Sequence, residues 1–218
     1  MLTRVLEPEL MDDPQESMAY DEMDHDQVNR SFVADLLAFS ACKGDVLDLG
    51  TGTARIPIEL CKQASECRIM ASDAAVSMLD IARFNVSANN FDSRIQLHFG
   101  DSKQLSFDDA MFDVVISNSL IHHLPDGHSA VGEMIRVLKP GGSIFVRDLC
   151  RPKSNAEVEN LVAQYTANES PASQQLFRQS LIAALTVCEM QNLVERCGMN
   201  GSCVAMSSDR HWTWQAKK

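Results

Sequence analysis

Residues 46–60, VLDLGTGTARIPIEL, decide the fold of this chain. An apolar run is followed by two glycines, Gly50 and Gly52, and then by a helical pattern. Glycine allows a sharp turn and lets a ligand approach the backbone without a Cβ atom in the way. The helix that follows turns its free N–H groups toward the same place. The stretch therefore predicts a ligand-binding turn between a buried strand and a helix.

Strand and helix patterns alternate around this turn. Apolar runs predict strands at 45–50, 67–72, 95–100, 112–118 and 143–149. Helical periods predict helices from about Asp26, at 54–64, at 75–88 and at 128–138, the last closed by residues 139–142. This alternation indicates βαβ units and a parallel sheet. Ligands of such sheets bind beyond the carboxyl ends of the strands.

The pattern changes after Cys150. Residues 155–167 and 173–185 are predicted helices, and Thr186 with Glu189 forms a capping box for a third helix that ends near Cys197. Gly198 is a natural stop for that helix. Two short strands at 202–208 and 211–216 lie so close in sequence that we expect an antiparallel hairpin at a sheet edge.

The overall charge favours a small molecule as partner. The chain has 218 residues, a net charge of -11 and a pI of about 4.9. Such a surface repels nucleic acid and anionic lipid, so neither is expected as a partner, and a homo-oligomer is left open. The seven cysteines show no metal-binding spacing, so we expect reduced core thiols and no metal. No secretory signal or membrane span is evident, which predicts a cytoplasmic protein.

Two aspartates frame the glycine turn. Asp48 lies two residues before Gly50, and Asp73 ends the second predicted strand. A carboxylate at Asp73 can accept both hydroxyls of a ribose, as NAD and S-adenosylmethionine sites both require. Asp48 would repel a pyrophosphate, and Arg55 stands where a dinucleotide site needs a small residue. A cationic ligand such as S-adenosylmethionine fits this turn better.

Further candidates for an adenine site follow the next elements. Asp101 and Ser102 come directly after the third predicted strand, where a carboxylate could receive the exocyclic amine. Ala74 and Met78 offer apolar and thioether surface beside the ring. An aspartate in a turn is common, so a purely structural Asp101 is the alternative.

Five ordered segments strengthen this interpretation: VLDLGTGTA, ASD, FGDSKQL, FDVVISNSLIHHL and VLKPGGSIFVRDL. Together they resemble the class I S-adenosylmethionine-dependent methyltransferases, most closely the small-molecule group called type 11. The family's third glycine is Ala54 here, which is small enough to keep the turn. The resemblance covers residues 45–150, roughly half of the chain.

We therefore expect an α/β fold with S-adenosylmethionine as cofactor. The sheet should be Rossmann-like, doubly wound and seven-stranded, mostly parallel with the last strand antiparallel, and carry a small helical cap. The whole chain is predicted to be one methyltransferase domain. Its segments are an N-terminal helical part (1–40), a cofactor-binding core (41–150), a helical cap (151–197) and a C-terminal hairpin (198–218).

The resemblance implies a role for each matching position. The methionine part is expected at Asp48, Gly50, Thr51 and Gly52, the ribose at Asp73, and the adenine at Asp101 and Ser102. Asn118 would lie beside the methionine amino group, and Leu120 in the wall near the methyl group. Tyr20 resembles an aromatic residue that closes over the cofactor in related enzymes; a structural tyrosine is the alternative.

His122 and His123 are the candidate catalytic residues, because a histidine near neutral pKa can take a proton from an acceptor. The alternative is that they only orient neighbouring groups, since a sulfonium is already activated and positioning can supply most of the catalysis. Arg147, Arg151 and His211 are candidate substrate-binding residues. Arginines can clamp a carboxylate or phosphate, and a structural arginine–aspartate pair is weighed equally.

Two other functions stay open at this stage. A nicotinamide-dependent oxidoreductase could use a related sheet, although Asp48 and Arg55 disfavour it. A non-catalytic module could keep the S-adenosylmethionine pocket without an acceptor site. The acceptor itself is not encoded in any pattern that we recognise.

Overall fold

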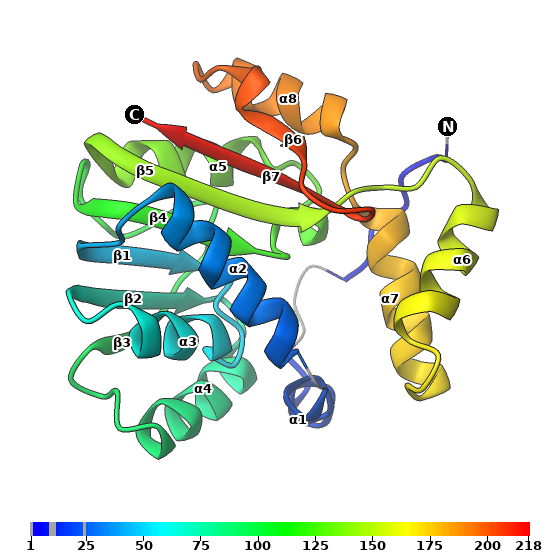
Figure 1. The fold of residues 1–218 in the computed structure, drawn as a ribbon, viewed down its shortest axis with the longest axis horizontal. Helices are drawn as coiled ribbons and strands as arrows, with labels where there is room; N and C mark the ends of the chain where they lie inside the picture. Colours follow the sequence, from blue (N-terminus) through cyan, green and yellow to red (C-terminus); the bar gives the residue numbers. More distant parts are fainter. Residues whose placement is uncertain (1, 9–11, 24) are drawn as a thin grey trace. The chain divides into compact units, whose positions relative to one another are not determined.

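The computed structural model describes residues 2–8, 12–23 and 25–218. Its strands form a seven-stranded sheet in the order β3-β2-β1-β4-β5-β7-β6 (Figure 1). The strands are β1 Gly44–Leu49, β2 Cys67–Asp73, β3 Ile95–Phe99, β4 Phe112–Asn118, β5 Leu138–Leu149, β6 Val204–Met206 and β7 His211–Lys217. The pairs β1–β2, β1–β4 and β2–β3 are parallel, whereas β6 and β7 are antiparallel. The predicted Rossmann-like fold class is confirmed.

The chain divides into two compact units. The first comprises the described residues within 1–9, 119–128 and 147–214, and the second those within 10–118, 129–146 and 215–218. The predicted single domain with four segments stays a prediction.

The second unit contains most of the parallel strands. Its helices are α1 Pro14–Glu22, α2 Asp26–Phe39, α3 Arg55–Gln63, α4 Val76–Ala88 and most of α5 His128–Val137. Figure 1 shows α2 and α3 in front of the strands of this unit. Apolar side chains from α2, α3 and the strands form its core, among them Phe32, Leu36, Val46, Ile58 and Ile116. The register pairs Asp48 with Ala71 and Ile116, which brings the ends of β1, β2 and β4 to one edge.

The first unit contains three helices and the C-terminal hairpin. They are α6 Asn155–Tyr165, α7 Pro171–Ala183 and α8 Val187–Arg196, and Figure 1 shows α6 and α7 side by side. Leu149, Val158, Val162, Leu181 and Ala184 form its apolar core. This unit also holds two short 3₁₀ helices, η1 Ile121–His123 and η2 Gly201–Cys203.

The predicted ends of α8 are confirmed. Thr186 and Glu189 form a reciprocal capping box. Gly198 follows the helix with a left-handed φ of 83°, a conformation that glycine adopts without steric cost.

Two predicted boundaries were wrong. Residues 139–142 were expected to form a loop, but β5 begins at Leu138, directly after α5. The reason is pairing with the chain end: Gly141 N–H donates to the Lys218 carbonyl at 2.7 Å, and Lys218 N–H donates to the Gly142 carbonyl at 3.0 Å. The strand predicted at 202–208 shortens to β6, because residues 201–203 form η2 and Asn200 caps it.

The cysteines are all free in the described residues, as predicted from their spacing. Only Cys42, Cys61 and Cys67 are buried, so the expectation of core thiols holds for three of the seven. None of the helices in the described ranges has the length and apolar character needed to cross a bilayer.

Candidate functional site

Several residues of the turn after β1 adopt the left-handed backbone conformation, with positive φ. Gly50 and Gly52 have φ values of 71° and 54°, and Ala54, the position of the family's third glycine, has a φ of 61°. Gly50 N–H donates to the Ser72 carbonyl at 2.9 Å, which fixes the turn to β2. A Cβ atom built on Gly52 would meet no atom within 4 Å. The backbone at this turn therefore faces open space that a ligand can enter.

Two buried polar groups at this turn lack partners. Asp48 is 2% exposed, and its Oδ2 has no hydrogen-bond partner within the described ranges of the chain. The hydroxyl of the buried Thr51 also has no partner of hydrogen-bond geometry there, although it lies close enough to Asp48 to act against the rise in the pKa of that carboxyl. Burial raises the pKa of Asp48 to about 7. A cationic, hydrogen-bonding ligand would supply what both groups lack, so the residues fit the amino group of the predicted cofactor.

Asp73 is held in place by the same turn. Gly52 N–H donates to its Oδ2 at 2.7 Å, and Ala75 N–H donates to its Oδ1 at 2.9 Å. Each oxygen keeps a further lone pair for a ribose hydroxyl. Burial raises the pKa of Asp73, and burial together with the nearby Asp73 charge raises the pKa of Tyr20. The structure thus brings Tyr20 close to the predicted ribose carboxylate.

The residues predicted to bind the adenine differ in their exposure to solvent and in their partners. Met78 and Ser102 are buried and Ala74 is half-buried. Asp101 is exposed, and its carboxylate binds Lys103 through the backbone N–H at 2.8 Å and the side-chain Nζ at 3.2 Å. Asp101 therefore already has a partner, which favours the structural alternative at this position.

Asn118 and Leu120 fall on different sides of the unit boundary. Asn118 ends β4 in the second unit, whereas Leu120 belongs to the first. Both residues are half-buried. Their predicted roles at the methionine group and the methyl wall stay predictions.

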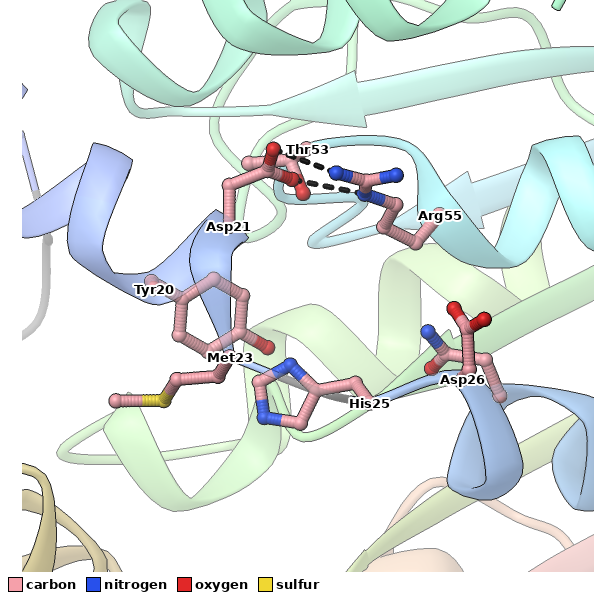
Figure 2. A pocket seen from close by; sticks show the side chains of 8 residues that line it. Tyr20, Asp21, Met23, His25, Asp26, Thr53 and Arg55 are labelled. Atoms are coloured by element: carbon pink, nitrogen blue, oxygen red, sulfur yellow. Dashed lines mark hydrogen bonds and ion pairs between the residues drawn. The ribbon is translucent and has the colours of Figure 1, made fainter. Parts of the chain in front are cut away.

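A cavity of about 210 Å³ lies beside the turn, between α1 and the start of α3 (Figure 2). It is lined by Tyr20, Asp21, Met23, His25, Asp26, Asn29, Thr53 and Arg55. Figure 2 shows the Asp21 carboxylate facing the Arg55 guanidinium, with two bonds of 2.9 and 2.7 Å. Asn85 also donates to Asp21 at 3.1 Å. Asp21, which the sequence did not single out, ties α1 to the helix that follows the glycine turn.

The two histidines lie together in the first unit. The Nδ1 atom of His122 is 2.5 Å from Asp148 Oδ1, and its backbone N–H donates to Asp148 Oδ2 at 3.0 Å. On the other side of the ring, Nε2 of His122 is 3.2 Å from Glu7 Oε1. His123 Nδ1 is also 3.2 Å from that same oxygen. We call Glu7, His122, His123 and Asp148 the histidine cluster.

The charges of the cluster act on the two histidines in opposite ways. Burial alone would lower the pKa of His122, but Asp148 and Glu7 raise it to about 9. Burial and the neighbouring His122 lower the pKa of His123. By itself, therefore, the protein keeps His122 protonated at neutral pH and His123 neutral.

The predicted substrate residues have partners within the first unit. Arg151 is buried and donates to the carbonyls of Leu2 and Ala184 at 3.0 and 2.7 Å and to Glu189 at 2.6 Å. Arg147 donates to Thr213 at 2.9 Å. The structural alternative is favoured for Arg151, although its acidic partner is Glu189 rather than Asp148.

His211, the third predicted substrate residue, lies at the start of β7. Its Nδ1 lies 2.9 Å from the Ser208 hydroxyl, and burial lowers its pKa to about 4. A neutral imidazole there can donate or accept a hydrogen bond but cannot hold an anion by charge.

The role of the segment 2–8 was not predicted. It was expected to belong to the N-terminal helical part (1–40), but residues 2–8 form no helix, and Glu7 joins the histidine cluster. Arg4 donates to four carbonyl oxygens of the first unit, those of Ala183, Pro125, His122 and Leu124. Glu7 lies 115 positions before His122 (122 − 7), and no local signal could have linked them.

The chain is similar to known proteins in sequence and in fold. A family model described as a methyltransferase domain matches residues 42–215. The demethylmenaquinone methyltransferase of Desulfitobacterium hafniense is 29% identical over 184 residues, which cover 76% of this chain and 72% of that protein. Other curated relatives are 28–35% identical, and the matches span 42–64% of their lengths.

Solved structures share the fold. A Methanococcus maripaludis protein described as a putative S-adenosyl-L-methionine-dependent methyltransferase superposes with a TM-score of 0.75 at 20% identity, covering 96% of this chain and 95% of that one. A Haemonchus contortus phosphoethanolamine N-methyltransferase, in complex with S-adenosylhomocysteine, has a TM-score of 0.60 at 22% identity and covers 77% of this chain and 36% of its own.

Proposed function

The chain belongs to the S-adenosylmethionine-dependent methyltransferase family, and we propose that it methylates an oxygen, nitrogen or carbon atom of a small molecule. The observation that carries the proposal is a pair of buried groups at a glycine turn open to a ligand: Asp48 Oδ2 and Thr51 Oγ1 have no partner of hydrogen-bond geometry among the described residues. The curated relatives named as quinone methyltransferases support a small organic acceptor for this chain too.

The second unit would hold the cofactor. Asp48, Thr51 and the backbone of Gly50 and Gly52 would bind its methionine part, and Asp73 its ribose. Ala74, Met78 and Ser102 would line the adenine side, and Tyr20 would cover the ribose region. The bound cofactor supplies a methyl group on a sulfonium, which is already an activated leaving group. The chain's own contribution is to orient the partners and exclude water.

We assign proton removal from the acceptor, where the acceptor needs it, to the histidine cluster. The 24% exposed side chain of His123 is the accessible part of this cluster. His122 has Asp148 on one side of its ring and Glu7 on the other. His122 is thus held from both sides, and His123 is the more accessible of the two rings. Arg147 and His211 remain candidate acceptor contacts, and the cytoplasmic location and a possible homo-oligomer remain predictions from the sequence.

Ligand-dependent thermal unfolding tests the cofactor. S-adenosylhomocysteine should raise the melting temperature, because a ligand that binds only the folded state stabilises it. NAD at the same concentration should leave the melting temperature unchanged. Stabilisation by NAD alone would instead support the oxidoreductase alternative.

Substitution of Asp73 tests the ribose contact. Asp73→Ala should weaken S-adenosylhomocysteine binding by about 1.5–3 kcal/mol, the scale of hydrogen bonds to a charged group. Asp80→Ala is the matched control, because Asp80 is an exposed acid on α4 of the same unit. Equal dissociation constants for the two variants, measured by calorimetry, would remove Asp73 from this role.

Labelling identifies the acceptor. Methyl-labelled S-adenosylmethionine incubated with cell extract and the protein should yield a labelled small molecule that mass spectrometry can identify. The control is the Asp73→Ala variant at the same concentration. Tight cofactor binding without any labelled product would favour the non-catalytic alternative.

A further inference from the structure

Three potential metal ligands converge in the first unit. Single ligand atoms of Glu7, His122 and His123 all lie within 4.8 Å of one another. The Glu7 side chain is 7% exposed, and His122 is almost fully buried. Two imidazoles and one carboxylate form a ligand set found at zinc sites that keep an open fourth position.

The distances from Glu7 to the two histidines fit a tetrahedral ion. Zinc bonds to nitrogen and oxygen are about 2.0–2.1 Å long, so two ligands of a tetrahedral site lie roughly 3.3–3.4 Å apart. His122 Nε2 and His123 Nδ1 each lie 3.2 Å from Glu7 Oε1. The carboxylate is thus already at the ligand-to-ligand distance from both rings.

The other side of the His122 ring has an acceptor. Its Nδ1 atom is 2.5 Å from the Asp148 carboxylate. Metal-binding histidines almost always donate their second N–H to a carboxylate or a backbone carbonyl in this way. Such contacts fix the tautomer and direct the remaining nitrogen lone pair at the metal.

A single proton cannot provide hydrogen bonds to Glu7 from both histidine rings. A proton on His122 Nε2 can bridge that ring to Glu7. His123 Nδ1 nevertheless stays buried without a hydrogen-bond partner in the part of the chain that the structure describes, because its close approach to Glu7 lacks hydrogen-bond geometry. A divalent ion serves both rings and the carboxylate at once, and it displaces that proton when it binds.

The segment that carries Glu7 is firmly held. Arg4 donates to the Ala183 carbonyl at 2.6 Å and to the Leu124 carbonyl at 2.9 Å. Ser180 donates to both oxygens of Glu7 at 3.2 Å. The ligand atom is therefore positioned before any ion arrives.

We propose that Glu7, His122 and His123 form a binding site for a divalent metal ion of the zinc type, with Asp148 as the outer partner of His122. The fourth position is left for water or for an oxygen atom of an acceptor. The sequence predicted no metal, because one ligand lies in a segment without any recognisable pattern.

Metal analysis of the full-length protein tests the proposal. Chelator-treated wild-type protein, incubated with ZnCl₂ and then desalted, should retain one zinc per chain by elemental analysis. Glu7→Gln should bind zinc at least about 100-fold more weakly in calorimetry. Asp148→Asn should lose about 10–100-fold, the usual effect of removing an outer partner. Far-UV circular dichroism and S-adenosylhomocysteine binding show whether each variant is folded.

The matched control is Glu159→Gln, the same change at an exposed carboxylate of the first unit that pairs with Arg178. It should bind zinc like the wild type. Cobalt substitution separates the site from the free thiols: a tetrahedral spectrum without thiolate bands supports the proposal, and thiolate bands contradict it. Less than one retained zinc per wild-type chain, or equal affinities of Glu7→Gln and Glu159→Gln, would also overturn it. S-adenosylhomocysteine binding is scored separately, so a failed metal site and a failed methyltransferase are distinguishable.

Discussion

Two buried carboxylates near the ends of strands behave in opposite ways. Asp48 in β1 is 2% exposed and Asp148 in β5 is 1% exposed. Burial raises the pKa of Asp48 to about 7. Burial also acts to raise the pKa of Asp148, but His122 and two backbone N–H groups lower it below its usual value. The difference is the cation: Asp148 Oδ1 lies 2.5 Å from His122 Nδ1, whereas Asp48 has the neutral Thr51 hydroxyl beside it and its Oδ2 has no hydrogen-bond partner among the described residues.

The two carboxylates differ in where the opposite charge comes from in the ligand-free protein. His122 supplies it for Asp148. For Asp48 we propose that the positive partner is the amino group of the bound cofactor. Removing the charge should therefore harm the protein at one position and help it at the other.

The largest effect is expected for Asp148→Asn. It removes the nearer of the two carboxylates that face the charge of His122 and leaves Glu7, so the loss should approach the roughly 3–5 kcal/mol of unfolding free energy that breaking a buried pair costs. Urea unfolding of the ligand-free protein measures this loss. Asp209→Asn, at an exposed ion pair with Arg210, should cost less than about 1 kcal/mol. Equal losses in both variants would contradict the assigned importance of Asp148.

Asp48→Asn should change the free energy of unfolding in the opposite direction and stabilise the ligand-free protein. A pKa raised from 3.8 to about 7 corresponds to roughly 4 kcal/mol of destabilisation above pH 7. Removing the charge recovers this free energy. The buried amide that replaces the carboxylate also lacks a partner, which costs about 1–3 kcal/mol of the recovered stability. The ligand-free variant should thus be about 1–3 kcal/mol more stable in urea, while its affinity for S-adenosylmethionine falls by about 1.5–3 kcal/mol. A variant that is both less stable and unchanged in affinity would reverse the comparison.

The raised pKa of Asp48 also predicts a pH dependence. Its folded-state pKa lies above its unfolded value, so its contribution to stability is present below about pH 4 and is lost as the pH rises toward 7. Cofactor binding should show the opposite trend, because we propose that the ionised carboxylate binds the cation. Affinity should rise about fivefold from pH 6 to pH 7, a range in which an α-amino group stays mostly protonated. Calorimetry at both pH values should show no such rise for Asp48→Asn.

A smaller effect on stability is expected for a substitution of Asp21, a partly exposed carboxylate that forms an ion pair with Arg55. Its side chain is 16% exposed, and Arg55 lowers its pKa against the effect of burial. Asp21→Asn should cost about 0.5–1 kcal/mol in urea unfolding, because the Arg55 side chain is largely solvated. A loss as large as that of Asp148→Asn would show that burial does not set the order of these effects.

The sequence predicted the fold well because its signals are local. The glycine turn, the alternating apolar runs and the Thr186–Glu189 capping box each depend on residues within a few positions of one another. The start of β5 could not be predicted, because residues 139–142 are drawn into the sheet by Lys218 at the far end of the chain.

The residues of the candidate site also divide into those with a local sequence signal and those without one. Asp48 and Asp73 could be found because each lies near the carboxyl end of a strand next to the glycine turn. Glu7 and Asp21 could not, because their partners lie 115 and 34 positions away (122 − 7 and 55 − 21). Arg151 was assigned to the substrate, but its donors are used by Leu2, Ala184 and Glu189, none of which is near it in sequence.

The C-terminal strand provides an optical reporter. The chain has only two tryptophans, Trp212 and Trp214, and both are fully buried in β7 within the first unit. Their fluorescence on heating therefore follows the first unit alone, whereas far-UV circular dichroism averages over the whole chain. Coincident transitions would mean that the two units unfold cooperatively as a single domain, and separate transitions would mean that they are energetically independent.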